Sequence, residues 1–313
     1  MIRTNETTPR WLRGYTKFVA AATLFLIFAG AMVTSTGSGL AVPDWPLSYG
    51  MLFPPMVGGI FYEHGHRMIA ASVGLLTVIQ AFFLMRWEPK RFVRRLGWIA
   101  VAVVVAQGLL GGLTVIFLLP LAISVSHAGL AQIFLCLNIA IAFFTSRSYE
   151  RLATGGWQRG ATPAIYILPL IVYLQILAGA LMRHLGAGLA IPDFPLAFGR
   201  LVPELTTIGV AINFTHRIGA AIVLLVVVLT MREIRGAGES FRLLHRGLFG
   251  ILVVQIALGA QTVWSGKHPI TTSLHVVTGA LLLGTAFLLM LAVRTARADE
   301  KNEPAAIARE VAA

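Results

Sequence analysis

The segment AGAMVTSTGSGLAVPDWPLSYGMLFP at residues 29–54 occurs a second time as AGALMRHLGAGLAIPDFPLAFGRLVP at residues 178–203. The two copies are identical at 14 of 26 positions. A duplication of this kind predicts two halves of similar fold, which we place at residues 1–150 and 151–313. The last stretch, from Arg297 to Ala313, is charged and rich in alanine, and we expect it to form a mobile tail.

The repeat continues beyond the quoted segment at an offset of 148 to 150 residues. Each half therefore carries two histidines, one arginine and one glutamine at equivalent places. The aligned pairs are His66 with His216, Arg67 with Arg217, Gln107 with Gln255, and His127 with His275.

The composition of the 313 residues excludes a water-soluble protein, because 57% are hydrophobic, only 12% are charged and the mean hydropathy is +0.79. A helix needs about 20 apolar residues to cross the hydrocarbon core of a membrane. The chain contains eight such runs, near residues 17–34, 65–85, 97–119, 124–146, 162–182, 212–231, 247–264 and 272–293. We therefore predict an all-α polytopic membrane protein with eight transmembrane helices. The single cysteine, Cys136, excludes an intrachain disulfide and a zinc site built on cysteines.

The positive charges define a topology. If the N-terminus lies inside, 20 of the 25 Lys and Arg residues fall on the inner side of the eight spans. This asymmetry places both termini in the cytoplasm by the positive-inside rule. The net charge of +12 is thus a consequence of topology, and it gives no reason to expect nucleic acid as a partner. Each half has four spans, so we expect two tandem pseudo-symmetric four-helix bundles, related by an axis along the membrane normal.

The four repeated histidines each open an even-numbered span, directly after an outside loop. From each histidine to the first arginine at the inner end of its helix there are 16 to 20 residues, or roughly 24–30 Å of helix. All four should therefore lie near the outer edge of the membrane. Ionisable residues that face the interior of a bundle at such a depth are functional candidates. For any one histidine taken alone, a hydrogen bond to a neighbouring carbonyl is the competing interpretation.

Recurrence in pairs favours a shared ligand. The second and fourth spans of a half run in the same direction, so His66 and His127, and likewise His216 and His275, can point into one cavity. An iron porphyrin between two imidazoles fits such a bundle. Zinc needs three or four ligands, so two histidines per half are too few unless Glu63 joins them. The sequence thus predicts four iron-ligating histidines.

These residues together resemble a known family. The loop GLAVPDWPLSYG, the ExxHR motif from Glu63 to Arg67, a histidine opening the fourth span, and a degenerate copy with Asn213, His216 and Arg217 are similar to haem A synthase. The resemblance covers about residues 15–295. It implies a bacterial plasma-membrane enzyme that oxidises the methyl group at ring position 8 of haem O to a formyl group, giving haem A for terminal oxidases. It also implies a substrate site in the N-terminal half and a haem b cofactor in the C-terminal half, both near the extracytoplasmic face.

The outside loops depart from those of some family members, because they contain no cysteine pair. Other contacts must therefore hold them. Pro43-Asp44-Trp45-Pro46 and Pro192-Asp193-Phe194-Pro195 are candidates, since proline fixes its own φ and restricts the preceding residue. Simple rigid turns and lids over a porphyrin are both compatible with these segments.

The two halves differ three residues before the first ligand, where Glu63 stands in one and Asn213 in the other. Residues three apart on a helix share a face, so Glu63 should look toward the same cavity as His66. A carboxylate there can accept a proton from water or stabilise positive charge. The alternative is an ion pair between Glu63 and Arg67 at a wet helix end. Arg67 and Arg217 are candidates to bind the haem propionates, with interfacial snorkelling as the alternative.

The mechanism stays open at this level. If both imidazoles remain on the substrate iron, O₂ has no free coordination position, so one histidine must dissociate. Otherwise the porphyrin loses electrons and water captures a carbocation at the methyl carbon with help from Glu63. The expected partners are haem O, haem O synthase as its supplier, the lipid membrane and an electron donor or acceptor outside the chain; a homo-oligomer is also compatible. The competing function is a bis-histidine dihaem protein that transfers electrons from quinol, which would not need a base in one half only.

Overall fold

The computed structural model describes residues 7–152, 163–234 and 238–300. Within this part of the chain the regular structure is helical, apart from two isolated β-bridges in the outer loops. The helices are α1 Arg10–Ser35, α2 Gly58–Trp87, α3 Arg91–Ile116, α4 Leu121–Phe144, α5 Arg147–Leu152, α6 Pro163–His184, α7 Ile208–Ile234, α8 Glu239–Trp264 and α9 Pro269–Glu300, with a 3₁₀ turn η1 at Ala187–Leu189.

The eight spans expected from hydropathy are confirmed. Among the described residues, eight helices are long and apolar enough to cross a membrane, and only the short α5 is not. Large apolar side chains such as Phe18, Leu75 and Leu225 are exposed on the outside of the bundle. Lipid can solvate these side chains, while each helix satisfies its own backbone hydrogen bonds.

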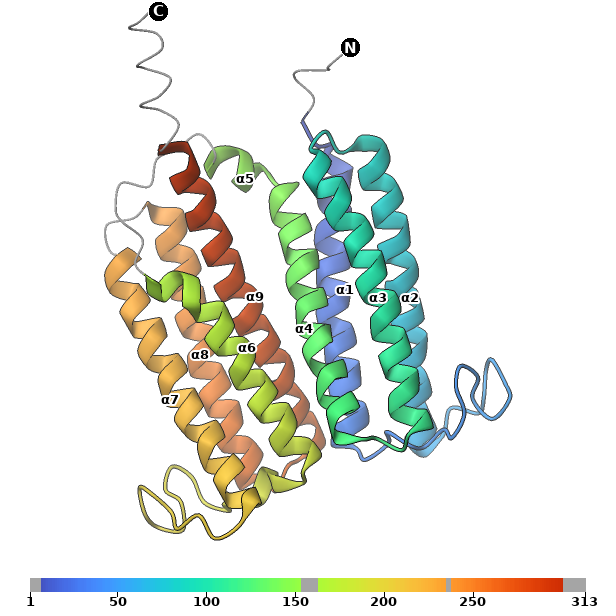
Figure 1. The fold of residues 1–313 in the computed structure, drawn as a ribbon, viewed down its shortest axis with the longest axis vertical. Helices are drawn as coiled ribbons and strands as arrows, with labels where there is room; N and C mark the ends of the chain where they lie inside the picture. The colour runs from blue at the N-terminus through green and yellow to red at the C-terminus, as the bar shows by residue number, and fades with distance from the viewer. Residues whose placement is uncertain (1–6, 153–162, 235–237, 301–313) are drawn as a thin grey trace, which may run out of the picture.

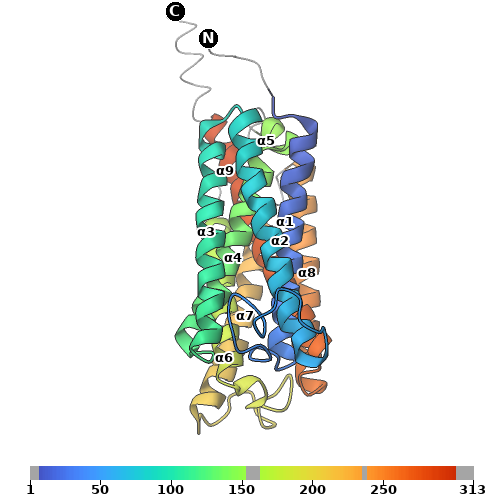
Figure 2. The ribbon, with the colours of Figure 1, turned by 90° about the vertical axis from the view of Figure 1, so that its right-hand side faces the viewer.

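The helices form two groups of four (Figure 1). In the first group α1 contacts α2, α2 contacts α3, α3 contacts α4, and α4 closes on α1. The second group repeats the pattern with α6, α7, α8 and α9. A view from the side shows the helices running along one common direction (Figure 2). These contacts agree with a fold of two bundles, whereas the symmetry axis stays a prediction.

The two groups meet through α1, α4, α6 and α9. Apolar side chains fill much of the contact, among them Ile27, Leu135 and Ala280. Polar bonds join the groups close to the loops: Ser35 and Ser273 hydroxyls lie 2.9 Å apart, and Arg183 donates to the carbonyl oxygen of Ala31 at 2.9 Å and to Ser35 at 2.6 Å. The halves are therefore fastened together on the side of the molecule that carries the histidines.

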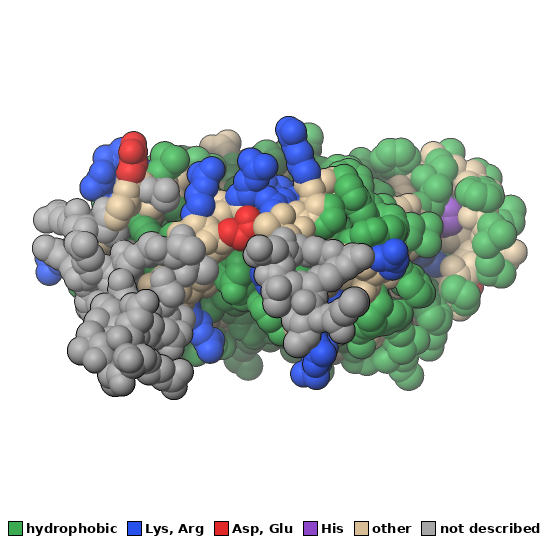
Figure 3. Space-filling view, turned by 90° about the horizontal axis from the view of Figure 1, so that it is seen from above, with side chains coloured by type: hydrophobic (Ala, Val, Ile, Leu, Met, Phe, Trp, Pro, Cys, Tyr) green, Lys and Arg blue, Asp and Glu red, His purple; other side chains and the backbone are tan. Residues whose placement is uncertain are grey.

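The ends of the bundle differ in character. The start of α1 and the end of α9 lie together at one end, and the long loops at residues 36–57 and 185–207 lie at the other (Figures 1 and 2). Lys and Arg side chains gather at the end that holds α5 and the termini of α1 and α9 (Figure 3). Exposed Arg91, Arg95 and Arg147 belong to this set. The orientation of this end toward the cytoplasm stays a prediction.

The helix boundaries correct one prediction. The histidines do not open their helices, because α2 begins eight residues before His66 and α4 begins six residues before His127. The same offsets hold for His216 in α7 and His275 in α9. At about 1.5 Å per residue the four histidines lie roughly 9–12 Å inside the helix start. Hydropathy missed these turns because glycine and polar residues continue a helix without adding to an apolar run. The expected tail is also shortened, because α9 continues to Glu300; residues 301–313 lie outside the described part.

Candidate functional site

The four repeated histidines come together in the two predicted pairs. His66 on α2 and His127 on α4 each face a glycine of the first helix group, and His216 on α7 and His275 on α9 each face a glycine of the second. The pairs arise because α2 and α4, and likewise α7 and α9, run in the same direction within their groups. In the described part of the chain, no three or more His, Cys, Asp or Glu side chains are grouped as a metal site.

Each histidine packs against a glycine of the preceding helix. A Cβ added to the glycine would lie 2.9–3.1 Å from the Cε1 atom of the imidazole, so a side chain there would push the ring away. The pairs are Gly30 with His66, Gly111 with His127, Gly179 with His216, and Gly259 with His275. This contact occurs four times and places all four rings in equivalent surroundings.

The hydrogen bonds of the rings differ between the halves. In the C-terminal half Nδ1 of His275 donates to the carbonyl oxygen of Gln255 at 3.1 Å, and Nδ1 of His216 lies 3.1 Å from the amide nitrogen of Gln175. In the N-terminal half Nδ1 of His66 and Nδ1 of His127 are buried without a partner. Buried imidazole nitrogens of this kind are suited to an additional ligand, because burial without a partner is unfavourable.

Glutamines lie beside three of the four histidines. The amide nitrogen of Gln107 donates to the carbonyl oxygen of His127 at 3.0 Å, and that of Gln175 donates to the carbonyl oxygen of His216 at 2.7 Å. Gln255 contacts His275. Gln107 and Gln255 were identifiable as a repeated pair, whereas Gln175 has Leu26 at its equivalent position. The signal for Gln175 is its place four residues before Gly179, the same spacing as Gln107 to Gly111 and Gln255 to Gly259.

Glu63 is buried and its carboxylate is engaged on both oxygens. One oxygen pairs with Arg67 at 2.6 Å and the other accepts the backbone N–H of Val42 at 2.8 Å. The side chains of Glu63 and Arg67 are only 5% and 16% exposed. The ion pair considered as an alternative is thus present, but it lies in a buried position and not at a wet helix end.

The two motif arginines hold the outer loops. Arg67 donates to the carbonyl oxygens of Asp44 at 2.7 Å and Leu47 at 2.8 Å. Arg217 likewise donates to Leu196 at 2.8 Å and Ile191 at 3.1 Å, and to the side chain of Asn213 at 3.0 Å. A guanidinium group has several donors in a fixed plane, which suits it to several carbonyls at once. A role of either arginine toward haem propionates stays a prediction.

The proline-bracketed segments form matching turns. Asp44 accepts the backbone N–H groups of Tyr49 and Gly50, and Asp193 accepts those of Phe198 and Gly199. These bonds, first those from the glycines, lower the pKa of both carboxyls. Each turn also contains a cis X-Pro peptide, at Trp45-Pro46 and at Phe194-Pro195. The expectation that these segments hold the loops without a disulfide agrees with this geometry.

The first outer loop reaches the N-terminal histidine pair. The ring of Trp45 lies so close to Gly112 that an added Cβ would be 2.6 Å from it, and Gly111 next to it faces His127. His64 was not predicted as a ligand. Its Nδ1 atom forms a hydrogen bond of 2.8 Å with the hydroxyl of Ser48, which belongs to the same loop as Trp45. In the second half Trp264 donates to the carbonyl oxygen of Phe194 at 3.3 Å. The loop is thus fixed against α2 and α3 beside the site.

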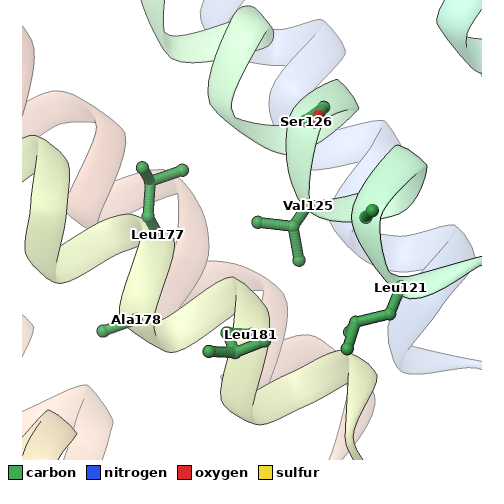
Figure 4. Close-up of a pocket in the computed structure, with 7 residues that line it drawn as sticks. Leu121, Val125, Ser126, Leu177, Ala178 and Leu181 are labelled. Atoms are coloured by element: carbon green, nitrogen blue, oxygen red, sulfur yellow. The ribbon is translucent and has the colours of Figure 1, made fainter.

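An apolar cleft of about 480 Å³ lies between α4 and α6. Figure 4 shows Leu121, Val125 and Ser126 on α4 opposite Leu177, Ala178 and Leu181 on α6. Ser126 precedes His127, and Ala178 precedes Gly179, the glycine that faces His216. The cleft therefore lies between α4, which carries His127, and α6, whose Gly179 faces His216.

The fold and the site together define a class. The described part of the chain is an eight-span membrane protein with one pair of half-buried histidines in each of two helix groups, an arrangement suited to bind an iron porphyrin in each group.

Comparison with known proteins agrees with this class. The sequence profile of the cytochrome oxidase assembly protein family matches residues 57–287. A relative from Symbiobacterium thermophilum named haem A synthase is 31% identical, over 86% of this chain and 91% of its own length. A relative of the same name from Geobacillus kaustophilus is 28% identical, over 93% of this chain and 95% of its own length. Another, from Staphylococcus aureus, is 29% identical, over 90% of this chain and 96% of its own length. The chain therefore belongs to the haem A synthase family.

Proposed function

We propose that the chain binds haem O between His66 and His127 and oxidises its ring methyl group at position 8 to the formyl group of haem A. The relatives that carry the name haem A synthase cover most of this chain, so the chain is a membrane enzyme of haem A biosynthesis. The site lies toward the extracytoplasmic face of a bacterial plasma membrane. Haem O synthase supplies the substrate, and an electron donor or acceptor outside the chain completes the reaction.

One observation carries this proposal: a glycine faces each imidazole in two equivalent pairs, and two of the buried ring nitrogens have no partner. The C-terminal residues fit a resident haem b, held by His216 and His275, because the Nδ1–H of His275 donates to the carbonyl oxygen of Gln255 and so directs Nε2, which has only a long contact of 3.5 Å with the amide of Gln255, toward a ligand. When bound, that cofactor supplies electron transfer to and from the other half. The competing function, electron transfer alone, is not favoured by the relatives' name.

The residues of the N-terminal half have distinct roles in this proposal. His66 and His127 position the substrate, and Glu63 contributes a negative charge one helical turn from His66. That charge can stabilise positive charge that develops on the substrate or accept a proton from water. Arg67 and Val42 hold the carboxylate in place through the contacts described above. The loop carrying Trp45 covers α3 beside the site and limits the access of water.

Extraction of haems tests the proposal. Cells that produce haem O should form haem A when this chain is expressed, and mass analysis of extracted haems should show the formyl product. The variant His66→Ala with His127→Ala serves as the matched control, since it removes the proposed substrate ligands and should leave haem O unchanged. If haem O persists with neither a hydroxylated nor a formyl product from the unmodified chain, the proposal is wrong.

The glycines that face the imidazoles give a further prediction. Gly259→Val should lower haem retention in the C-terminal half, because its side chain displaces His275. Changes next to a metal-ligating histidine typically weaken metal affinity by about 10–100-fold, and a loss in this range is expected. Gly108→Val is the control, since a Cβ at Gly108 meets no atom within 4 Å. Haem content of the purified variants measures the effect; equal content in both variants would contradict the assigned ring position.

A further inference from the structure

Arg183, near the end of α6, reaches out of its own helix group. Its Nη2 atom donates to the carbonyl oxygen of Ala31 at 2.9 Å and to the hydroxyl of Ser35 at 2.6 Å, both on α1. Within the described residues its Nε and Nη1 atoms donate no hydrogen bond, and no carboxylate pairs with it. The half-buried guanidinium group thus has no counter-charge in this part of the chain. In a membrane protein such a charge is costly and marks a functional site.

The guanidinium group of Arg183 lies at the level of the histidines, between the two helix groups. On α6, Arg183 follows by four residues the glycine that faces His216, and residues four apart share a helix face. On α9, Ser273 precedes His275 by two residues, or about 3 Å along the helix axis, and its hydroxyl lies 2.9 Å from that of Ser35. Arg183 is therefore connected through Ser35 to the turn of α9 that carries His275.

The N-terminal half lacks this cation, because its equivalent residue is Thr34. The hydroxyl of Thr34 donates back to the carbonyl oxygen of Gly30 at 3.4 Å. Arg217, predicted to bind a propionate in the C-terminal half, uses all three guanidinium nitrogens for Asn213 and two loop carbonyls. Arg183 keeps two nitrogens for a ligand, so it is the better placed of the two arginines.

We infer that Arg183 binds a propionate of the porphyrin held by His216 and His275 and connects this porphyrin to α1 of the other half. The inference rests on the proposed function, since it assumes the haem b of the C-terminal half. A guanidinium group matches the two oxygens of a carboxylate, and a propionate supplies the negative charge that the surroundings of Arg183 lack. Thr34 offers the substrate porphyrin no cation at the equivalent place.

Haem b and its dimethyl ester, in which both propionates are uncharged, test the inference on the purified chain. The rate of transfer to excess apomyoglobin is measured for the haem that His275→Ala fails to hold. A hydrogen bond to a charged group typically changes an equilibrium by about 10–100-fold, so Arg183→Gln should lose haem b faster by a factor in this range. The same variant should lose the dimethyl ester at the wild-type rate, because the ester has no charge to pair with Arg183.

Further variants separate the charge of Arg183 from its packing. Arg183→Lys keeps the charge without the planar fork, so it should lose haem b more slowly than Arg183→Gln. Arg200→Gln removes an arginine from an exposed ion pair with Glu204, and it should lose both haems at the wild-type rates. The wild-type protein gives a test without any substitution, because it should hold haem b longer than the ester.

Equal acceleration for haem b and the ester in Arg183→Gln would overturn the inference, because the arginine would then only support packing. An unchanged rate for haem b, or a wild-type protein without haem at His216 and His275, would overturn it too. Failure of the proposed function looks different. A charge-dependent rate without any haem A in cells would refute the proposed oxidation and leave the contact of Arg183. Normal haem A formation without a charge-dependent rate would refute the inference alone.

Discussion

Purified His216→Ala and His275→Ala should each lack the tightly held haem of the wild-type protein. Each imidazole packs against a glycine, and His275 also donates from Nδ1 to the carbonyl oxygen of Gln255; loss of either histidine leaves one of two proposed ligands. Since changes beside a ligating histidine already weaken metal affinity by about 10–100-fold, loss of the ligand itself should exceed this range. Haem content by pyridine haemochrome measures the effect.

His268→Ala is the control for this experiment, because His268 is exposed after the end of α8 and has no repeat partner. It should retain the wild-type haem content. Full haem content in purified His216→Ala or His275→Ala would show that the C-terminal pair does not hold the cofactor.

Glu63→Gln should keep haem binding but lose most haem A formation. The amide oxygen still accepts the N–H of Val42, so the loop contact remains, whereas the negative charge next to His66 is gone. General acid–base catalysis typically contributes about 10²–10⁴-fold in rate, and a loss in that range is expected. The measurement is the rate of haem A formation per bound haem.

Glu204→Gln is the matched control, because Glu204 also pairs with an arginine four residues away, Arg200. This pair lies on an exposed loop, with side-chain exposures of 75% for Glu204 and 64% for Arg200. It should form haem A at the wild-type rate. Unimpaired product formation by Glu63→Gln would reduce Glu63 to an anchor of Arg67 and the loop.

Much of the fold could be predicted from the sequence, because spans are set by the width of the hydrocarbon core. The eight helices followed from the span count, and their contacts place His66 with His127 in one group and His216 with His275 in the other. The helix starts were predicted too late. Residues such as Gly58 and Gly59 add little hydropathy, yet they continue α2 toward the loop.

The contacts of polar side chains were the harder part. The sequence left open whether Arg67 binds a haem propionate, snorkels to the interface or pairs with Glu63. The structure shows the ion pair with Glu63 and contacts to loop carbonyls, which the sequence did not predict because any backbone carbonyl can accept from a guanidinium group. Gln175 was missed because it has no repeat partner, and only its spacing to Gly179 marks it. Comparison of the two halves finds only the residues that both halves share.

The most direct test of the central claim is a density map of the protein purified from cells that supply haem O. The account predicts iron between His66 and His127 and between His216 and His275, with the porphyrin planes inside the two helix groups. Porphyrin bound elsewhere, or iron ligated by other side chains, would contradict it.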